Sequence, residues 1–129
     1  MSKSKVLVVE DDHLTKDVLA QIIEALGYEV DACDNGEKAI QKISSFQPDL
    51  ILSDVLMPEF SGLQLLNYLQ KKTSSTIPVV LISTLDAHSL EDIAEDVGAA
   101  GVLSKPPRKE EMAELFEKAI NDSVPLLTA

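Results

Sequence analysis

Acidic side chains follow two apolar segments of this chain, at the points where those segments end. Glu10, Asp11 and Asp12 come directly after the apolar run at residues 6–9, and Asp54 follows two residues after the run at residues 50–52. If both runs are neighbouring parallel strands, these carboxylates meet at one edge of a sheet. Clustered carboxylates repel each other and are tolerated mainly where a hard cation or a chemical step needs them. The pattern therefore predicts a cation-binding or catalytic site.

Two further polar features follow predicted strands later in the chain. Ser83-Thr84 comes at the end of the strand expected at residues 79–83, and Lys105-Pro106 comes after the strand expected at residues 101–104. Open α/β sheets bind ligands outside the carboxyl ends of their strands, and in the order 2-1-3-4-5 the site lies between strands one and three. These strand ends would collect carboxylates, a hydroxyl group and one ammonium group at that point.

The elements that position these side chains form an alternating pattern. Short β-branched runs predict strands at Lys5–Val9, Glu29–Ala32, Leu50–Ser53, Val79–Ser83 and Gly101–Ser104. Apolar residues three and four apart between them predict amphipathic helices at Leu14, Val18, Ile22 and Leu26, at Ala39, Ile43 and Phe46, at Leu63, Leu66 and Leu69, at Leu90, Ile93 and Val97, and at Met112, Leu115, Phe116 and Ile120. Five β-α units predict an α/β fold with a parallel sheet.

Length, charge and cysteine content restrict the class of protein. The 129 residues fit one domain, expected over residues 1–122, with residues 123–129 as a tail or the start of a linker. The net charge of -11 repels phosphate backbones and argues against direct nucleic-acid binding. A single cysteine, Cys33, and the absence of a long apolar stretch predict a cytoplasmic protein without a membrane segment.

The motifs together resemble the receiver domain of two-component response regulators, over essentially the whole chain. They are Val-Val-Glu-Asp-Asp at residues 8–12, Asp54-Val-Leu-Met-Pro at residues 54–58 followed by Gly62, Ser83-Thr84, and Lys105-Pro106. The resemblance implies a doubly wound (βα)5 flavodoxin-like fold with a five-stranded parallel sheet in the order 2-1-3-4-5. It also implies a cis peptide bond between Lys105 and Pro106.

The resemblance implies that Asp54 accepts a phosphoryl group from a phosphohistidine. The donor would be a sensor histidine kinase or a histidine phosphotransfer protein, and the output would be a contact with a downstream protein or effector domain. Mg²⁺ or Mn²⁺ would bind Glu10, Asp11, Asp54 and the backbone carbonyl of Leu56. Ser83 and Lys105 would each contact a phosphoryl oxygen. Hard oxygen ligands and positive charge suit this chemistry, because a carboxylate must approach a phosphorus that already carries negative oxygens.

The chain departs from the family pattern at positions concerned with switching and gating. Of the expected set (Ser83, Thr84, Val102, Leu56 and Leu85), Val102 stands where the family commonly has an aromatic switch residue. Readout would then depend on Ser83 and the loop after it, while Pro107 stiffens the loop before the last helix. The resemblance implies that Leu56 and Leu85 flank the path of attacking water, and their apolar side chains then predict a longer-lived phosphoryl state than polar residues would give. Phosphate release from a Leu56→Asn, Leu85→Glu double variant would test this.

Simpler structural roles compete with these assignments. Asp12 is best interpreted as a helix N-cap, and Ser83 could satisfy a backbone group at a strand end. His13 and His88 have no partner ligand at metal-binding spacing and are expected to be exposed. Cys33 is expected to be a small strand residue. The acidic residues along 91–96 and 110–117 are expected to form solvated helix faces.

Three alternative functions remain open at this stage. A receiver-like scaffold that is never phosphorylated would keep the fold, and Val102 and Pro107 leave this possibility standing. An aspartate-nucleophile phosphatase is disfavoured because Leu56 stands where such enzymes place a second aspartate. A flavodoxin-like nucleotide binder is disfavoured because no glycine-rich turn follows the first strand. For a downstream partner we expect a face that includes Ser89, Asp92, Glu95, Lys109 and Met112.

Overall fold

A single parallel sheet forms the centre of the molecule in the computed structural model, which describes residues 3–55, 62–72, 77–84, 92, 95 and 98–122. The strands are β1 (Lys5–Val9), β2 (Glu29–Cys33), β3 (Leu50–Asp54), β4 (Val79–Ser83) and β5 (Gly101–Ser104). They pair in the order β2-β1-β3-β4-β5, so the predicted fold class and sheet order are confirmed. The strands end within one residue of the predicted bounds, and β3 extends to include Asp54.

The described helices connect these strands in the expected β-α alternation. They are α1 (His13–Ala25), α2 (Gly36–Phe46), α3 (Gly62–Lys72) and α5 (Lys109–Asp122). The apolar positions of the helix expected at residues 90–97, namely Leu90, Ile93 and Val97, lie outside the described residues, and so does the expected tail at residues 123–129. Within the described part of the chain, no helix is long and apolar enough to cross a bilayer.

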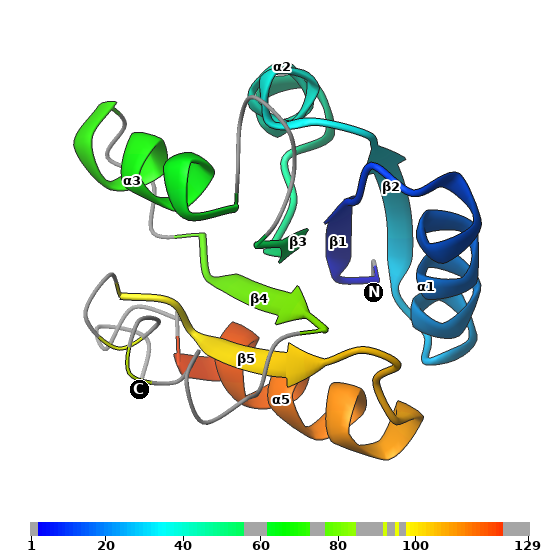
Figure 1. Cartoon of the computed structure of the whole chain (residues 1–129). Coiled ribbons are helices and arrows are strands. Elements are labelled where there is room, and N and C mark those ends of the chain that lie inside the picture. The colour runs from blue at the N-terminus through cyan, green and yellow to red at the C-terminus, as the bar shows by residue number, and fades with distance from the viewer. Residues whose placement is uncertain are drawn as a thin grey trace.

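Helices cover the two faces of the sheet in pairs (Figure 1). Successive side chains along a strand point to opposite faces. Leu7 and Val9 of β1 accordingly pack in one buried cluster with side chains from α2 and α3, and Val6 and Val8 pack in another with side chains from α1 and α5. The central strands β1, β3 and β4 are buried on both faces, which explains why their sequences are apolar almost without interruption.

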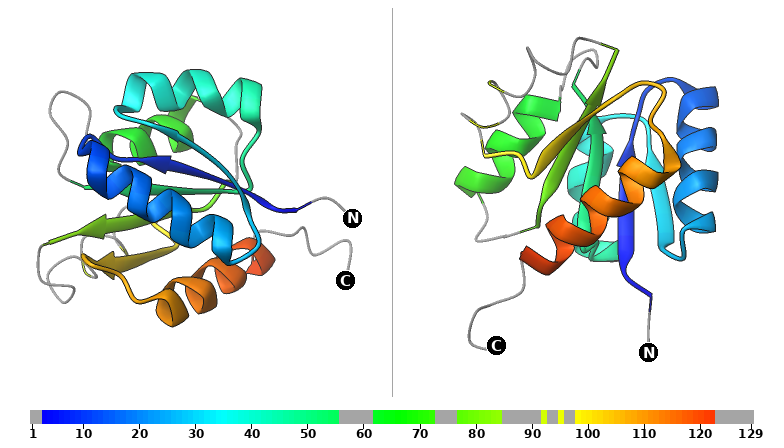
Figure 2. Two further views of the ribbon diagram at one scale, coloured as in Figure 1. Left: turned by 90° about the vertical axis from the view of Figure 1, so that its right-hand side faces the viewer. Right: turned by 90° about the horizontal axis from the view of Figure 1, so that it is seen from below.

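All five strands run in one direction, so their carboxyl ends share one edge of the sheet (Figure 2). We call this the carboxyl edge. The start of β1 and the end of α5 lie on the opposite side of the molecule (Figure 2). The register places Val9 opposite Ser53 and Ser83 opposite Ser104. The paired strands therefore end at nearly the same level along the strand direction, and the residues that follow them lie at the same edge. The topology therefore brings the predicted site residues to one place.

Helix α1 begins as the sequence predicts. The carboxylate of Asp12 accepts hydrogen bonds from the backbone N–H of Thr15 at 2.8 Å and from the Thr15 hydroxyl at 2.5 Å. These bonds lower the pKa of Asp12. Asp12 is the N-cap residue of α1, and the first residue of the helix, His13, is exposed as expected. Asp12 thus has a structural role that separates it from the other acidic residues of the cluster.

The apolar stripe predicted for α1 is only partly correct. The buried residues of this helix are Leu19 and Ile23, whereas Leu14 is 74% exposed and Val18 is 46% exposed. Leu19 and Ile23 belong to the cluster between α1, α5 and the sheet. Because α1 carries two adjacent apolar stripes, the one centred on Leu19 packs on the sheet, and the other extends to the surface beside the carboxyl edge.

Met112 does not belong to a partner surface, contrary to the prediction. Its side chain is fully buried in the same core cluster as Phe116 and Ala119 of α5. Lys109, Asp92 and Glu95 are exposed, and Ser89 lies outside the described residues. Met112 and Phe116 lie four residues apart on the face of α5 that packs against the sheet, so the apolar period of the helix decides the position of Met112.

Candidate functional site

Three carboxylates converge at the carboxyl edge, as the strand ends predict. One side-chain oxygen from each of Glu10, Asp11 and Asp54 lies within 4.8 Å of the others. Glu10 follows β1, and its backbone N–H donates to the carbonyl of Cys33 at the end of β2, which extends the pairing of β1 and β2 by one residue. Glu10 and Asp54 are buried, whereas Asp11 is exposed. The donor set consists of charged oxygen atoms, which suits a hard divalent cation.

Lys105 lies against the two buried carboxylates. Its Nζ atom is 2.6 Å from Oδ2 of Asp54 and 2.7 Å from Oε2 of Glu10. The backbone N–H of Lys105 donates to the carbonyl of Ser83 at 2.9 Å, which fixes the start of the side chain beside the end of β4. The following peptide bond to Pro106 is cis, as expected. Lys105 is therefore not a solvated surface lysine; it is the counter-charge of the acidic cluster.

Burial and charge alter the protonation equilibria of this cluster in opposite ways. Burial raises the pKa of Glu10 to about 7, and the hydrogen bonds from Lys105 and from the backbone N–H of Asp12 offset this effect only in part. Burial alone would lower the pKa of Lys105, but its hydrogen bonds to Asp54 and Glu10 outweigh that effect and raise it. The ammonium group therefore stays charged near neutral pH, where it can pair with an anionic ligand.

The remaining predicted residues occupy different positions around the carboxyl edge. Ser83 ends β4 and is buried, and Thr84 beside it is exposed. Val102 is half-buried in β5, opposite Leu81, and packs against the cluster under α2 and α3. Leu56 and Leu85 lie outside the described residues. Val102 thus belongs to the sheet and its packing, and the roles expected for Leu56 and Leu85 stay predictions.

Two residues near Asp54 have structural importance that the sequence reasoning did not assign. A Cβ atom at Gly62 would lie 2.5 Å from the backbone oxygen of Asp54 and 3.0 Å from Oγ of Ser53. Ser53 is buried, and its hydroxyl donates to the same Asp54 carbonyl at 3.1 Å. The start of α3 therefore packs directly on the end of β3, and only glycine fits there. In the sequence, the only indication of this close packing was the fixed spacing between Asp54 and Gly62.

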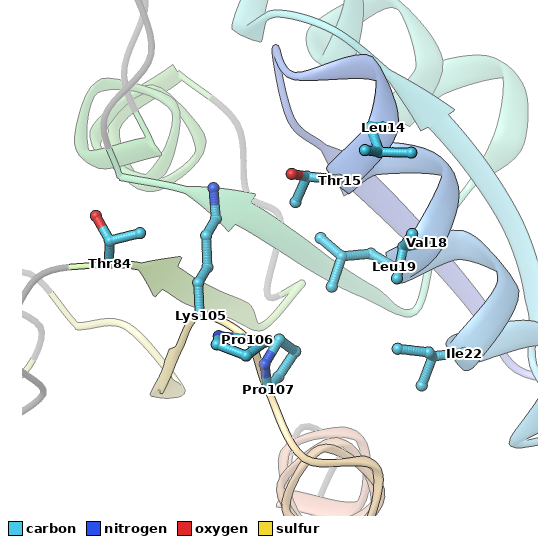
Figure 3. A pocket seen from close by; sticks show the side chains of 9 residues that line it. All are labelled: Leu14, Thr15, Val18, Leu19, Ile22, Thr84, Lys105, Pro106 and Pro107. Carbon is cyan, nitrogen blue, oxygen red and sulfur yellow. The ribbon is translucent and has the colours of Figure 1, made fainter.

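An apolar groove adjoins the acidic cluster (Figure 3). Its volume is about 440 Å³, and it runs between α1 and the segment that follows β5. The lining residues are Leu14, Thr15, Val18, Leu19, Ile22, Thr84, Lys105, Pro106 and Pro107. Figure 3 shows the α1 side chains on one side and the two prolines facing them. Lys105 lines both the groove and the acidic cluster, so the two features are continuous.

Comparison with known proteins identifies the family. The family model described as "Response regulator receiver domain" matches residues 6–117. The positive alginate biosynthesis regulatory protein of Pseudomonas aeruginosa is 39% identical over 118 residues, which cover 88% of this chain and 46% of that protein. The transcriptional regulatory protein CrdR of Helicobacter pylori is 30% identical over 120 residues, which cover 93% of this chain and 56% of that protein. The chain thus spans about half the length of these curated relatives.

Solved structures support the same assignment. The chemotaxis protein CheY4 of Vibrio cholerae superposes with a TM-score of 0.81 at 25% identity, covering 92% of this chain and 99% of that chain. The signal receiver domain of a signal transduction histidine kinase from Syntrophus aciditrophicus superposes with a TM-score of 0.79 at 31% identity, covering 92% of this chain and 91% of that chain. Because the family match begins in β1 and extends into α5, it includes every strand that builds the carboxyl edge, and the chain belongs to the response regulator receiver domains of two-component signalling systems.

Proposed function

We propose that Asp54 is the phosphoacceptor of this receiver domain and that the donor is a phosphohistidine on a kinase or phosphotransfer protein. The observation that carries this proposal is the position of the Asp54 carboxylate, at the end of β3, against Lys105 and beside two further carboxylates. An oxygen of Asp54 forms a bond to phosphorus while the bond between phosphorus and the histidine nitrogen breaks. The product is an acyl phosphate on Asp54.

The surrounding residues suit this transfer. Lys105 provides a positive charge within hydrogen-bonding distance of Asp54, and it can pair with a phosphoryl oxygen once the group is attached. Ser83, at the end of β4, is proposed to donate a hydrogen bond to a second phosphoryl oxygen. In dephosphorylation, water attacks phosphorus, the bond between phosphorus and Asp54 breaks, and inorganic phosphate leaves the free carboxylate of Asp54. The chain is therefore proposed to catalyse its own phosphorylation and dephosphorylation.

The acidic cluster is proposed to hold Mg²⁺ or Mn²⁺. Glu10, Asp11 and Asp54 fit such a cation because each offers a carboxylate oxygen and these oxygens lie close together. The backbone carbonyl of Leu56 is proposed as a further ligand. When bound, the cation would neutralise negative charge that develops on the transferring phosphoryl group. The fold positions the groups around the cation site: β1 and β3 present the carboxylates, and the segment after β5 presents Lys105.

The apolar groove is proposed as the place where the phosphodonor protein docks. A donor must bring its phosphohistidine to Asp54, so it must pack against the rim of the carboxyl edge. Leu14 and Val18 are exposed on that rim, and the groove that they line continues to Lys105. A downstream partner is proposed to bind the exposed side of α5 and its neighbours, through residues such as Lys109, Asp92 and Glu95.

Phosphorylation by a small acyl-phosphate donor tests the proposal directly. The purified chain is incubated with Mg²⁺ and the donor, and its intact mass is compared with that of Asp54→Asn. We expect one phosphoryl group on the wild type, none on Asp54→Asn, and none on the wild type with excess EDTA. The matched control is Asp17→Asn, which removes an exposed carboxylate from α1 and should leave phosphorylation unchanged.

A negative result would have a definite meaning. If the wild type gains no phosphoryl group while a known receiver domain reacts alongside it, the proposal is wrong, and the chain is better described as a fixed interaction scaffold. If Asp54→Asn is phosphorylated as readily as the wild type, the acceptor is another residue.

A further inference from the structure

Strand β2 is an outer strand of the sheet, with β1 as its neighbour (Figure 1). The backbone N–H of Glu29, its first residue, donates to the carbonyl of Ser4 at 2.9 Å. Alternate residues of a strand direct their backbone groups to the same side, so those of Asp31 also point toward β1. The backbone groups of Val30 and Ala32 point away from β1, and we call them the β2 edge. Outward groups of this kind can pair with a strand from another molecule.

The carboxylate of Asp31 occupies one of the two outward N–H groups. Its Oδ1 atom accepts a hydrogen bond from the backbone N–H of Ala32 at 2.8 Å. Its Oδ2 atom accepts a hydrogen bond from Nζ of Lys42, which belongs to α2, at 2.8 Å. A strand that pairs with the β2 edge must therefore displace a carboxylate that a neighbouring helix holds in place.

The ion pair between Asp31 and Lys42 orients the carboxylate and contributes little to folding stability. The side chains of Lys42 and Asp31 are 36% and 35% exposed, and exposed pairs are weakened by water and salt. The hydrogen bond to Asp31 raises the pKa of Lys42, so the ammonium group stays charged near neutral pH. Asp31 thus remains paired on one oxygen while the other accepts from the strand edge.

A second copy of this chain carries an edge that matches the first. Two β2 edges related by a two-fold axis would pair antiparallel, with Val30 of one copy opposite Ala32 of the other. The outward backbone groups of both copies would then find partners. The same register places Asp31 directly opposite Asp31 of the second copy, and like charges in that position are unfavourable. The carboxylate therefore opposes this pairing both by occupying the Ala32 N–H and by repelling its counterpart.

We propose that Asp31, oriented by Lys42, blocks the β2 edge against pairing with a second copy of this chain. The two residues have no part in the acidic cluster at the carboxyl edge, so the proposal does not depend on phosphorylation of Asp54. It assigns a function to a polar strand residue beside an otherwise available sheet edge: copies of the domain are prevented from joining into one continuous sheet.

Amide hydrogen exchange followed by NMR tests the hydrogen bond at Ala32. The wild type and Asp31→Val are compared at a protein concentration low enough to keep both monomeric. We expect the protection factor of the Ala32 N–H to fall about tenfold in Asp31→Val, because this group then bonds only to water. An unchanged protection factor would overturn the proposal.

The matched control is Glu29→Val, which removes an equal charge from an exposed position of the same strand. The Glu29 N–H already bonds toward β1, so this change leaves the β2 edge as it is. The protection factor of the Ala32 N–H should stay within about twofold of the wild type, since exposed charges are screened by salt. A loss as large as that in Asp31→Val would assign the effect to charge and contradict the proposal.

Sedimentation velocity over a range of protein concentrations tests the pairing itself. We expect Asp31→Val to self-associate with a dissociation constant at least about tenfold lower than that of the wild type or of Glu29→Val. As Asp31→Val associates, the N–H groups of Val30 and Ala32 should both gain protection, which would locate the interface at the β2 edge. Absence of association, or association without this gain in protection, would overturn the proposal.

Two lysines of α2 separate the contribution of Lys42 from a general effect of charge. Lys42→Met releases one oxygen of Asp31, and the protection factor of the Ala32 N–H should fall about threefold because the carboxylate is no longer held. Lys38→Met makes the same change in net charge, but Lys38 pairs with Asp34 at 3.0 Å and should have no effect on Ala32. Equal effects of the two variants would contradict the role proposed for Lys42.

Asp31→Asn guards against loss of structure in Asp31→Val. An amide oxygen can still accept from the Ala32 N–H, but it forms no ion pair with Lys42. We expect Ala32 protection in Asp31→Asn to lie between those of the wild type and Asp31→Val, and association to be weaker than in Asp31→Val. Association of Asp31→Asn as strong as that of Asp31→Val, with full Ala32 protection in its monomer, would show that the hydrogen bond does not block the β2 edge.

Discussion

Cys33 lies at the same edge of the sheet as the acidic residues, but its thiol has no part in their chemistry. The residue ends β2, is buried, and its Sγ atom lies 3.6 Å from the backbone oxygen of Asn35. Burial raises the pKa of the thiol to about 11. A protonated, enclosed thiol is a poor nucleophile and a poor redox sensor, which agrees with the prediction of a structural strand residue.

The raised pKa of Cys33 predicts a specific pH dependence of stability. Below about pH 8 the thiol is protonated in both states, so it contributes no pH dependence. As the pH rises from about 9 toward 11, the unfolded chain loses this proton while the folded chain keeps it, so folding stability falls by up to about 1.4 kcal/mol per pH unit. Cys33→Ala lacks this component. The difference in free energy of unfolding between the two proteins should therefore shrink from pH 8 to about pH 10.

Urea titrations of both proteins at several pH values measure this difference. Lysine and tyrosine titration affects both proteins alike, so the comparison isolates the thiol. A difference that stays constant over this pH range would show that the Cys33 thiol ionises equally well in the folded chain.

Individual site residues were predictable where strand geometry decides their position. The placement of Glu10, Asp11, Asp54 and Lys105 follows from the ends of apolar runs, and the structure brings these four residues together. The burial of Met112 was missed, because exposure within an amphipathic helix depends on which face packs on the sheet. The double contact of Lys105 was also beyond the sequence, since it depends on side-chain conformation.

At the scale of elements, α1 shows how a helix can serve two surfaces. Its Leu19 side packs on the sheet, and its Leu14 side lines the groove. Periodicity correctly predicted a helix here, but it could not distinguish two adjacent apolar stripes. The stripe that the sequence analysis predicted to be buried includes Leu14 and Val18, and both of these side chains are exposed. Which stripe of α1 is buried depends on where the sheet lies and on where Pro107 lies across the groove.

The N-cap of α1 is expected to contribute measurably to stability. Asp12→Ala removes the acceptor of both hydrogen bonds from Thr15, and loss of such a cap costs about 1 kcal/mol. Asp17→Ala, on the exposed side of the same helix, removes an equal charge without removing a cap. Urea unfolding should show a clear loss for Asp12→Ala and little change for Asp17→Ala. Equal losses would assign the effect to charge rather than to capping.

At the scale of the whole molecule, the sheet order was the most predictable property. Five β-α units with apolar strands require a parallel sheet covered on both faces, and right-handed crossovers leave few possible orders. The family resemblance then specified the order that the structure shows.

The net charge of -11 predicts how the fold responds to salts. Monovalent salt should raise stability modestly by screening repulsion among the acidic residues. At equal ionic strength, MgCl₂ should raise the thermal midpoint further, by roughly a few degrees, because the cation binds the folded state. Asp11→Asn should lose most of this additional gain, and Asp17→Asn should retain it. Scanning calorimetry measures the thermal midpoints of the wild type and both variants. An equal response of the two variants to MgCl₂ would exclude Asp11 from the cation site.

The start of β1 and the end of α5 lie on the side of the molecule opposite the carboxyl edge. An affinity tag or fluorescent protein joined beyond either end would therefore leave the molecule away from Asp54. The same geometry allows the chain to be immobilised on a sensor surface through one of these ends, with Glu10, Lys105 and the groove beside α1 facing the solution. A phosphodonor protein in the flow would then reach the acidic cluster without obstruction from the support.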